Sequence, residues 1–189
     1  RSNKSQHDIT TKYNLPSNYF LSLATLEPRK NIKNLLKAFS TFSKKNNNDI
    51  KLVLAGKPNS KIFATVPQNE KNNIQFIGFV DEEDKPELYA HAEAFIYPSL
   101  FEGFGLPLLE AMKVGNPIIT SNTSSMPEVV GDAAILINPL EPQKIAQAME
   151  QILEPQLKKT LRQKMDHQIK KFSWEKCARA TAKLLSLSE

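Results

Sequence analysis

The segment from Ser99 to Glu110 holds the residues whose types and spacing could best bind and polarise a ligand. Gly103 and Gly105 let a ligand approach the backbone and permit positive φ, and the amides that follow open a helical pattern, where an anion can bind. Glu102 and Glu110 fall near the same helix end. A carboxylate repels a phosphate but accepts hydrogen bonds from hydroxyl groups, so these two side chains would contact a sugar or a ribose.

Arg29 and Lys30 follow an apolar segment early in the chain and could supply the cations that phosphates need. An Arg side chain forks onto phosphate oxygens, whereas Lys acts as a point charge. With the two carboxylates, this pair indicates a diphosphate between two hydroxyl-rich groups, which describes a nucleotide sugar. Ordinary explanations stay open: Glu102 and Glu110 could compensate a helix dipole, the glycines could form a tight turn, and the cations could be solvated.

Six short apolar segments alternate with helical patterns, which predicts a parallel sheet. The expected strands are 19–24, 51–55, 74–77, 94–97, 117–120 and 134–137. The expected helices are 31–45, 81–92, 107–114, 127–130, 142–153, 155–171 and a last helix capped by Ser173. The fold class is therefore α/β, a Rossmann-like parallel six-stranded sheet with helices on both faces and a helical C-terminus. Ligands bind such sheets outside the carboxyl ends of the strands.

The two ends of the chain carry separate expectations. Residues 1–18 are polar without periodicity and predict a linker or tail, whereas 19–189 predict one domain. Because the chain begins at Arg1 without Met, we expect a fragment. A short helix is expected at 62–65, and the acidic run 81–84 is expected to open a helix for dipole reasons. The last helix has an expected buried face of Cys177, Ala178, Thr181, Leu184 and Leu185.

Charge and composition disfavour several classes of protein. The net charge of +5 is spread along the chain and includes only 4 Arg, unlike the dense basic stripe of a nucleic-acid binder. The single Cys177 excludes an internal disulfide and a Cys-based zinc site, and favours a reducing cytoplasm. His7, His91 and His167 lie far apart and no Asp-x-Asp occurs, so we expect no metal. No apolar run approaches the ~20 residues that span a bilayer.

Several motifs, in order, resemble the donor domain of retaining GT-B glycosyltransferases, a family often called glycosyl transferase group 1. The segment around Arg29 and Lys30 and the Glu-x7-Glu segment from Glu102 to Glu110 carry most of the likeness. The resemblance spans about residues 19–187. The motifs that match are 23–31, 52–56, 76–80, 102–110, 127–130 and 172–176.

The resemblance implies how a donor would be held. Arg29 and Lys30 match the basic pair that holds the donor diphosphate, with a catalytic role in stabilising the leaving group. Glu102 matches the Glu that contacts the donor sugar, and Glu110 matches the Glu that binds the ribose hydroxyls. The amides around sugar and phosphate match Gly103, Phe104, Gly105 and Leu106, and the loop that sandwiches the base matches Phe79 and Val80.

Other positions add to this picture or depart from it. Ser99 and Ser121 end predicted strands and could touch the sugar. Ala24 stands where the family usually has Gly, and Thr25 stands where many members carry Arg. Asn31 replaces the common Gly after Lys and is expected to cap the next helix.

The resemblance also implies a reaction. A full enzyme of this kind has two Rossmann-like domains around the active site, and this chain matches the second, so the N-terminal acceptor domain is absent. We expect a donor-binding half that is inactive alone, no metal or other cofactor, and no nucleic-acid partner. The reaction would move a sugar, with retention, to a saccharide or lipid-linked acceptor in polysaccharide biosynthesis.

Some alternatives stay open at this point. The donor is expected to be GDP-mannose, with UDP-glucose or a UDP-hexosamine as alternatives. The expected location is the cytoplasm, where the basic surface would let the full enzyme dock on anionic lipid at the inner face of the membrane. The chain could instead be a non-catalytic nucleotide-binding module, or a structural or nucleic-acid-binding domain.

Overall fold

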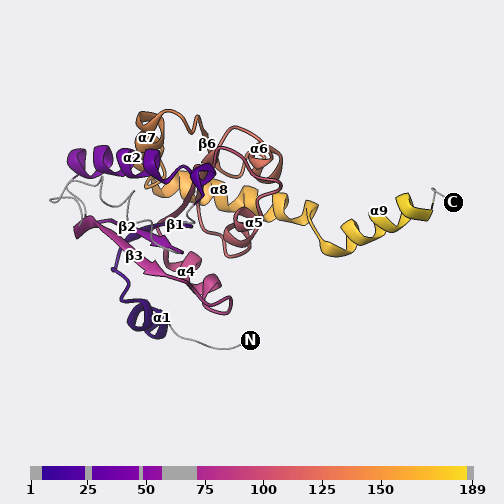
Figure 1. Ribbon diagram of the computed structural model, residues 1–189, viewed down its shortest axis with the longest axis horizontal. Helices are drawn as coiled ribbons and strands as arrows, with labels where there is room; N and C mark the ends of the chain where they lie inside the picture. Colours follow the sequence, from indigo (N-terminus) through magenta and orange to yellow (C-terminus); the bar gives the residue numbers. More distant parts are fainter. Residues whose placement is uncertain (1–5, 24–26, 47–48, 57–71, 187–189) are drawn as a thin grey trace.

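A parallel sheet forms the centre of the molecule. The computed structural model describes residues 6–23, 27–46, 49–56 and 72–186 (Figure 1). Within these residues, six parallel strands pair in the order β3-β2-β1-β4-β5-β6. They are β1 Tyr19–Leu23, β2 Lys51–Ala55, β3 Ile74–Gly78, β4 Ala94–Tyr97, β5 Ile118–Ser121 and β6 Ile135–Ile137. The strand order reverses between β1 and β4, which is where sheets of this type bind ligands.

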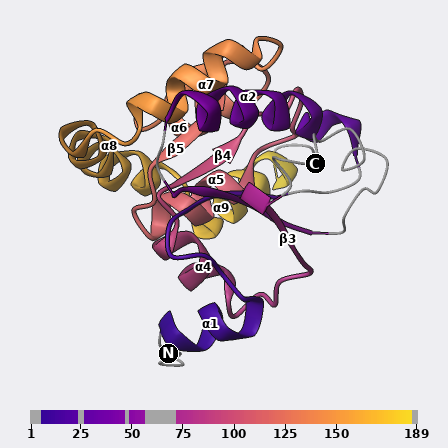
Figure 2. The ribbon, with the colours of Figure 1, turned by 90° about the vertical axis from the view of Figure 1, so that its left-hand side faces the viewer.

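Helices cover both faces of this sheet, as the alternating pattern predicts. In Figure 2, α2 (Ile32–Lys45) and α7 (Pro142–Gln151) lie over one face, while α4 (Lys85–His91) and α5 (Leu106–Lys113) lie over the other. The remaining α-helices in the described residues are α1 Gln6–Tyr13, α6 Met126–Val130, α8 Pro155–Gln168 and α9 Trp174–Ser186, with short 3₁₀ turns at Pro28–Lys30 (η1) and Ile169–Lys171 (η3).

Helix α2 shows how the sequence pattern becomes packing. Its apolar residues recur at helical spacing, so one face of the helix is buried against the sheet. Phe42 is completely buried there and meets Phe20 of β1 edge to face, with ring centroids 5.3 Å apart. Replacing such a side chain by Ala typically costs roughly 3–5 kcal/mol, because a cavity remains. This packing fixes the turn before α2, which carries Arg29 and Lys30.

The N-terminal segment corrects the expectation of a structureless tail. Residues 6–13 form helix α1, and Ile9 is only 1% exposed, so the helix contributes to the core. Tyr13 donates a hydrogen bond of 2.7 Å to the buried Asp84, which also pairs with Lys12. The acidic run is therefore explained differently from the prediction: α4 begins after it, at Lys85, and Asp84 makes no side-chain cap.

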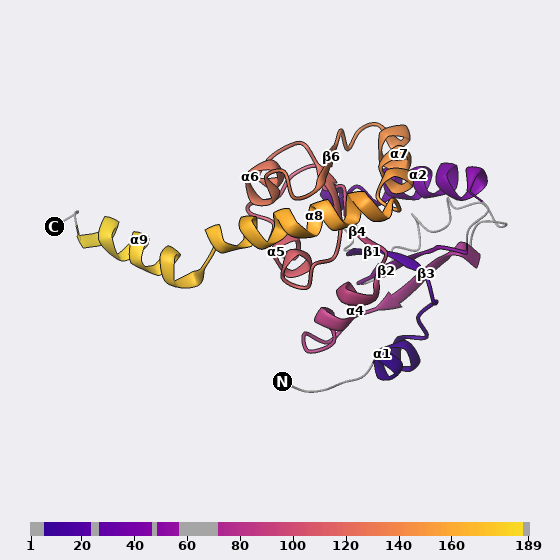
Figure 3. The same ribbon diagram turned by 180° about the vertical axis from the view of Figure 1, so that it is seen from behind.

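The C-terminal helix also departs from its predicted packing. Ser173 caps α9 as expected, since its hydroxyl accepts a hydrogen bond of 3.1 Å from the Lys176 amide. However, no residue of α9 is buried, and Trp174 is 79% exposed. Figure 3 shows α9 extending away from the sheet. Apolar residues from Cys177 to Leu185 do recur on one side of the helix, as predicted. This side is exposed, because nothing in the described part of the chain covers it.

Two further observations complete the fold. The short helix expected at 62–65 lies outside the described residues. Among the residues that the structure does describe, no helix combines the length and apolar character needed to cross a membrane.

Candidate functional site

Two loops meet at the carboxyl ends of β1 and β4, where the strand order reverses. One is the turn η1, which carries Arg29 and Lys30, and the other follows β4 and leads into α5. The Leu100 amide donates a 2.7 Å hydrogen bond to the Arg29 carbonyl, which joins the two loops directly. The structure thus brings Arg29 and Lys30 into contact with residues 100–102 of the segment that the sequence predicts for the same site.

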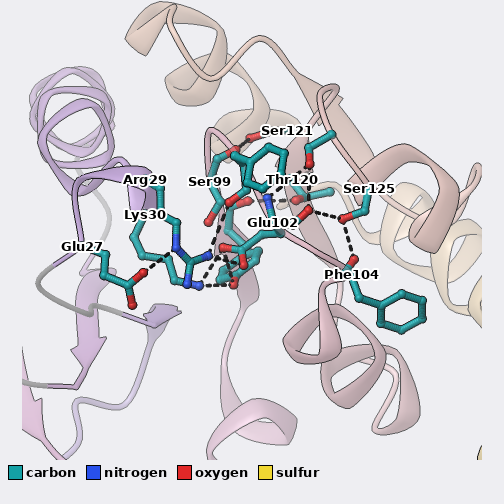
Figure 4. Close-up of polar contacts among 12 residues, drawn as sticks. Glu27, Arg29, Lys30, Ser99, Glu102, Phe104, Thr120, Ser121 and Ser125 are labelled. Carbon is teal, nitrogen blue, oxygen red and sulfur yellow. Dashed lines mark hydrogen bonds and ion pairs between the residues drawn. The ribbon is translucent and has the colours of Figure 1, made fainter.

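Glu102 is the centre of a charge cluster at this junction. Its carboxylate lies 2.7 Å from the Lys30 ammonium and also contacts the Arg29 guanidinium. Arg29 reaches Glu27 as well, and Figure 4 shows both basic side chains on the same side of Glu102. Lys30 and Glu102 are each only 8% exposed. A buried ion pair of this kind is costly unless each charge finds several partners, which these residues do.

Tyr97, at the end of β4, completes the cluster and was missed by the sequence reasoning. Its hydroxyl donates a 2.8 Å hydrogen bond to Glu102 Oε1 and accepts one from Lys30. Burial alone would raise the pKa of Glu102, but hydrogen bonds from Lys30 and Tyr97 outweigh it and hold that pKa below its ordinary value. Tyr97 could have been predicted as a site residue, because it is a polar side chain at the carboxyl end of a predicted strand, where such sheets bind ligands.

The loop after β5 fixes the main chain around Glu102. Ser124 adopts φ 55°, and its hydroxyl both accepts from the Glu102 amide and donates to the Glu102 carbonyl. Ser125 adds hydrogen bonds of 3.0 Å to the Glu102 carbonyl and 2.7 Å to the Phe104 carbonyl. Figure 4 shows Ser125 on the opposite side of Glu102 from the two basic residues. The prediction did not include these serines, because their pairing depends on tertiary contacts.

Glycine is required at one of the two predicted positions. Gly105 has φ 112° and precedes the first residue of α5. A Cβ there would lie 3.1 Å from Leu108 Cδ1, so both backbone and space favour glycine. Gly103 does not adopt the positive φ that glycine permits, and a Cβ on it would meet no atom of the described chain within 4 Å. The backbone at Gly103 is therefore open to a ligand.

Phe104 and Leu106 flank the start of α5, but their side chains line a separate cavity. Both are partly exposed and line a cavity of about 590 Å³ between α5 and the start of α9, together with Phe172 and Trp174. Phe104 and Phe172 meet edge to face at 5.7 Å. Only the main-chain amides of these two residues are thus left as candidates for anion binding at the helix N-terminus.

Glu110 and the other predicted contacts differ in how accessible they are. Glu110 is half-buried on α5 and accepts a 2.9 Å hydrogen bond from Tyr89 of α4. Phe79 is 79% exposed just beyond β3, whereas Val80 is buried. Ser99 is completely buried, so its side chain does not reach the surface. Ser121, also buried, bonds to the Ser99 carbonyl and links β5 to the loop.

Asn31 corrects a predicted role. It was expected to cap α2, but its side chain makes no cap hydrogen bond. Instead it donates to the carbonyls of Pro98 (3.0 Å) and Pro139 (2.7 Å), which ties η1 to the loops after β4 and β6. Asn31 has φ 58°, a region that Asn tolerates better than most residues. The predicted departures at Ala24 and Thr25 lie outside the described residues.

Metal ligation is a separate question from the charge cluster. Within the ranges that the structure describes, no three or more His, Cys, Asp or Glu side chains gather in a way that could hold a metal ion. The positive charge at this site comes from Arg29, Lys30 and the start of α5.

Comparison with known proteins shows the family to which this chain is related. The family model described as glycosyl transferases group 1 matches residues 4–172. The chain is 37% identical over 179 residues to O-antigen chain mannosyltransferase B of Escherichia coli, covering 92% of this chain and 47% of that protein. It is 36% identical over 177 residues to the serotype-specific mannosyltransferase WbdA of E. coli, covering 90% and 22%. This chain thus spans half or less of the length of these relatives.

A solved structure shows the same fold. Sucrose-phosphate synthase from Thermosynechococcus elongatus superposes with a TM-score of 0.81 at 25% identity, over 96% of this chain and 48% of that chain. From its sequence motifs, its strand order and the extent of the family match, this chain belongs to the glycosyl transferases group 1 family.

Proposed function

We propose that this chain is the donor-binding domain of a retaining glycosyltransferase. The enzyme would move a sugar from a nucleoside diphosphate sugar to a saccharide or lipid-linked acceptor in polysaccharide biosynthesis. The observation that carries the proposal is the cluster of Arg29, Lys30 and Glu102 at the strand-order reversal. Two cations that would bind a diphosphate lie there beside a carboxylate that would accept hydrogen bonds from sugar hydroxyls, next to the open backbone at Gly103.

The reaction needs negative charge on the leaving diphosphate to be stabilised. Arg29, Lys30 and the amides at the start of α5 would do this, since fixed positive charge beside a developing anion is the strongest common catalytic effect. Both cations contact Glu102 in the structure, so a diphosphate would compete with Glu102 for them. Glu102, released from that pairing, would accept hydrogen bonds from the sugar, and Glu110 would accept them from the ribose.

Positive charge from side chains and helix amides also leads us to propose a metal-independent reaction. The same three groups would carry the role that a divalent cation plays on a phosphate. Binding of the nucleotide sugar should therefore be the same with and without a chelator. A requirement for Mg²⁺ or Mn²⁺ would contradict this part of the proposal.

GDP-mannose is the donor that we propose. Two relatives above 35% identity are described as mannosyltransferases, one of them acting on the O-antigen chain. The names of these relatives support mannose as the sugar, because the proposed donor contacts lie in the part of their sequences that this chain matches. UDP-glucose and UDP-hexosamines remain the alternatives to compare.

A second domain would complete the active site. The match covers only 47% of one relative and 22% of the other, and α9 carries apolar side chains that nothing in the described residues covers. We propose that these side chains contact an N-terminal acceptor domain and that the present chain alone transfers no sugar. Leu184, Leu185 and Trp174 would form that contact.

Calorimetric titration with GDP, GDP-mannose, UDP and UDP-glucose at low salt tests the donor site. Saturable binding of one nucleotide is expected, with about tenfold tighter binding of its sugar form, the scale of one hydrogen bond to a carboxylate. Equal affinity for the nucleotide and its sugar form would favour a non-catalytic nucleotide-binding module. No binding by this chain or by a two-domain protein would overturn the donor-site proposal.

A further inference from the structure

Tyr97 holds a position in the charge cluster that the sequence motifs do not account for. Its hydroxyl lies between Lys30 and Glu102, accepting from the first and donating to the second over 2.8 Å. Lys30 also contacts the same carboxylate oxygen, Oε1, at 2.7 Å. The three polar groups therefore form a closed triangle, in which one corner is a neutral hydroxyl.

The Tyr97 hydroxyl is a rigid donor. Its ring is buried and stacks on Phe95 at 5.5 Å, and its carbonyl accepts a 2.8 Å hydrogen bond from Thr120 of β5. Burial raises the pKa of the phenol, and the Glu102 carboxylate raises it further, so the proton stays on the oxygen. Unlike Lys30, whose long side chain can turn, this group cannot move without disturbing the sheet.

This difference matters when a diphosphate competes for the cations. Lys30 and Arg29 would turn toward the phosphate oxygens, and Glu102 would then lose both ionic partners. The serine hydroxyls of the β5 loop hold the main chain of Glu102, not its carboxylate. Of the hydrogen bonds and ion pairs from Arg29, Lys30 and Tyr97 to the carboxylate, the one from the Tyr97 hydroxyl comes from a neutral group and would remain.

We propose that Tyr97 is a positioning residue whose hydroxyl holds the Glu102 carboxylate toward the donor sugar while Lys30 serves the diphosphate. This inference rests on the proposed function and deepens it. It assigns Tyr97 to recognition of the sugar rather than of the nucleotide. Its effect should therefore be absent when the ligand carries no sugar.

The chain offers a matched control for the loss of one buried phenol hydroxyl. Tyr19 of β1 is as buried as Tyr97, and its hydroxyl donates a 2.8 Å hydrogen bond to the Leu88 carbonyl, away from the cluster. Both Tyr97→Phe and Tyr19→Phe remove one oxygen and keep the ring. A general loosening of the fold would affect the two variants alike, whereas a positioning role would affect only Tyr97→Phe.

The test is a titration of the wild type, Tyr97→Phe and Tyr19→Phe with GDP and GDP-mannose, and with UDP and UDP-glucose. The measured quantity is the sugar gain, defined as the Kd of the nucleotide divided by that of its sugar form. In Tyr97→Phe the sugar gain should fall by about tenfold, to near one, which is the scale of one hydrogen bond to a carboxylate. The Kd of the free nucleotide should change less. Tyr19→Phe should keep the wild-type gain.

Other outcomes separate this inference from the function on which it rests. An unchanged sugar gain in Tyr97→Phe, or an equal loss for nucleotide and sugar nucleotide, would overturn the role of Tyr97 and leave the donor site standing. An equal fall in Tyr19→Phe would overturn it as well. If the wild type binds no nucleotide, the proposed function fails, and the inference fails with it.

A second measurement needs no ligand. Carboxyl-detected NMR would follow the titration of Glu102, whose carboxylate faces Lys30, Arg29 and Tyr97. Removing the Tyr97 hydroxyl should raise the pKa of Glu102, because one hydrogen bond to the charged form is lost. An unchanged titration in Tyr97→Phe would show that the contact does not hold the carboxylate and would overturn the proposal.

Discussion

The Lys30 ammonium and the Glu102 carboxylate lie 2.7 Å apart, and both side chains are almost completely buried. Neither charge can be removed without leaving the other in a poorly hydrated site. Lys30→Met should therefore lower the free energy of unfolding by about 3 kcal/mol, the lower end for breaking such a pair, because Arg29 still contacts Glu102. Denaturant unfolding measures this loss.

The same variant should weaken donor binding, most strongly at low salt, where attraction between Lys30 and the phosphates is least screened. Lys33, on the exposed side of α2, provides a control through Lys33→Met. Equal salt dependence of donor binding in the wild type and Lys30→Met would remove Lys30 from the diphosphate site.

Glu102→Gln should change two affinities in opposite directions. It removes the anion that competes with a diphosphate for Arg29 and Lys30, so the free nucleotide should bind about fivefold more tightly, on the scale of ~1 kcal/mol for one charge pair. It also removes the carboxylate that accepts from the sugar, so the sugar gain should disappear. Calorimetry with the nucleotide and its sugar form measures both effects.

Glu110→Gln is the comparison for that variant, since Glu110 is assigned to the ribose. It should weaken the nucleotide and the sugar nucleotide by the same factor and leave the sugar gain intact. A parallel loss of both affinities in Glu102→Gln would show that Glu102 contacts the nucleotide, contrary to its assignment.

The pH dependence of stability should report the Glu102 contacts. Burial opposes ionisation of Glu102, but hydrogen bonds from Lys30 and Tyr97 outweigh it and lower its pKa in the folded chain. The unfolded chain then binds a proton at higher pH than the folded chain does. The contribution of Glu102 is thus fully present above its ordinary pKa of about 4.3 and is lost as pH falls through the lower, folded value.

Thermal unfolding of the wild type and Glu102→Gln between pH 6 and pH 3 tests this direction. The difference in Tm between the two proteins should shrink as pH falls below about 4.3. Protonation then removes the negative charge of Glu102 in the wild type, and the variant has no negative charge at that position. A difference that stays constant across this range would show that the Glu102 carboxyl is not held by those contacts.

The alternation of apolar and helical segments was enough to predict the sheet and both helical layers. Strands such as Lys51–Ala55 are covered by helices on both faces, so their sequences are short, nearly continuous apolar runs. Helices such as α2 are longer and have apolar residues at every third or fourth position instead. The helix α2 likewise follows from the spacing of Leu35, Phe39 and Phe42. Local pattern and tertiary environment agree in these elements, which is why the prediction succeeded.

The predictions that failed concern residues whose structure depends on partners far away in the sequence. Helix α1 is polar on average, and its place depends on Asp84, more than sixty residues away, which binds Lys12 and Tyr13. Asn31 has the residue type of a helix cap, yet two distant carbonyls take its side chain. Tyr97 resembles an ordinary strand residue until the fold brings Lys30 and Glu102 to its hydroxyl. Such pairings between distant residues leave no periodic signal.

The exposed face of α9 leads to a last prediction. Leu184 and Leu185 are both more than 65% exposed, so Leu184→Ser with Leu185→Ser should change the free energy of unfolding of this chain by less than about 0.5 kcal/mol. Leu35→Ala, in the buried face of α2, should cost about 3 kcal/mol and serves as the positive control. In a two-domain protein the serine pair should lower Tm, since the proposed interface would lose its apolar contacts. A large loss in this chain alone would mean that α9 packs against its own domain, and the proposed interdomain contact would be wrong.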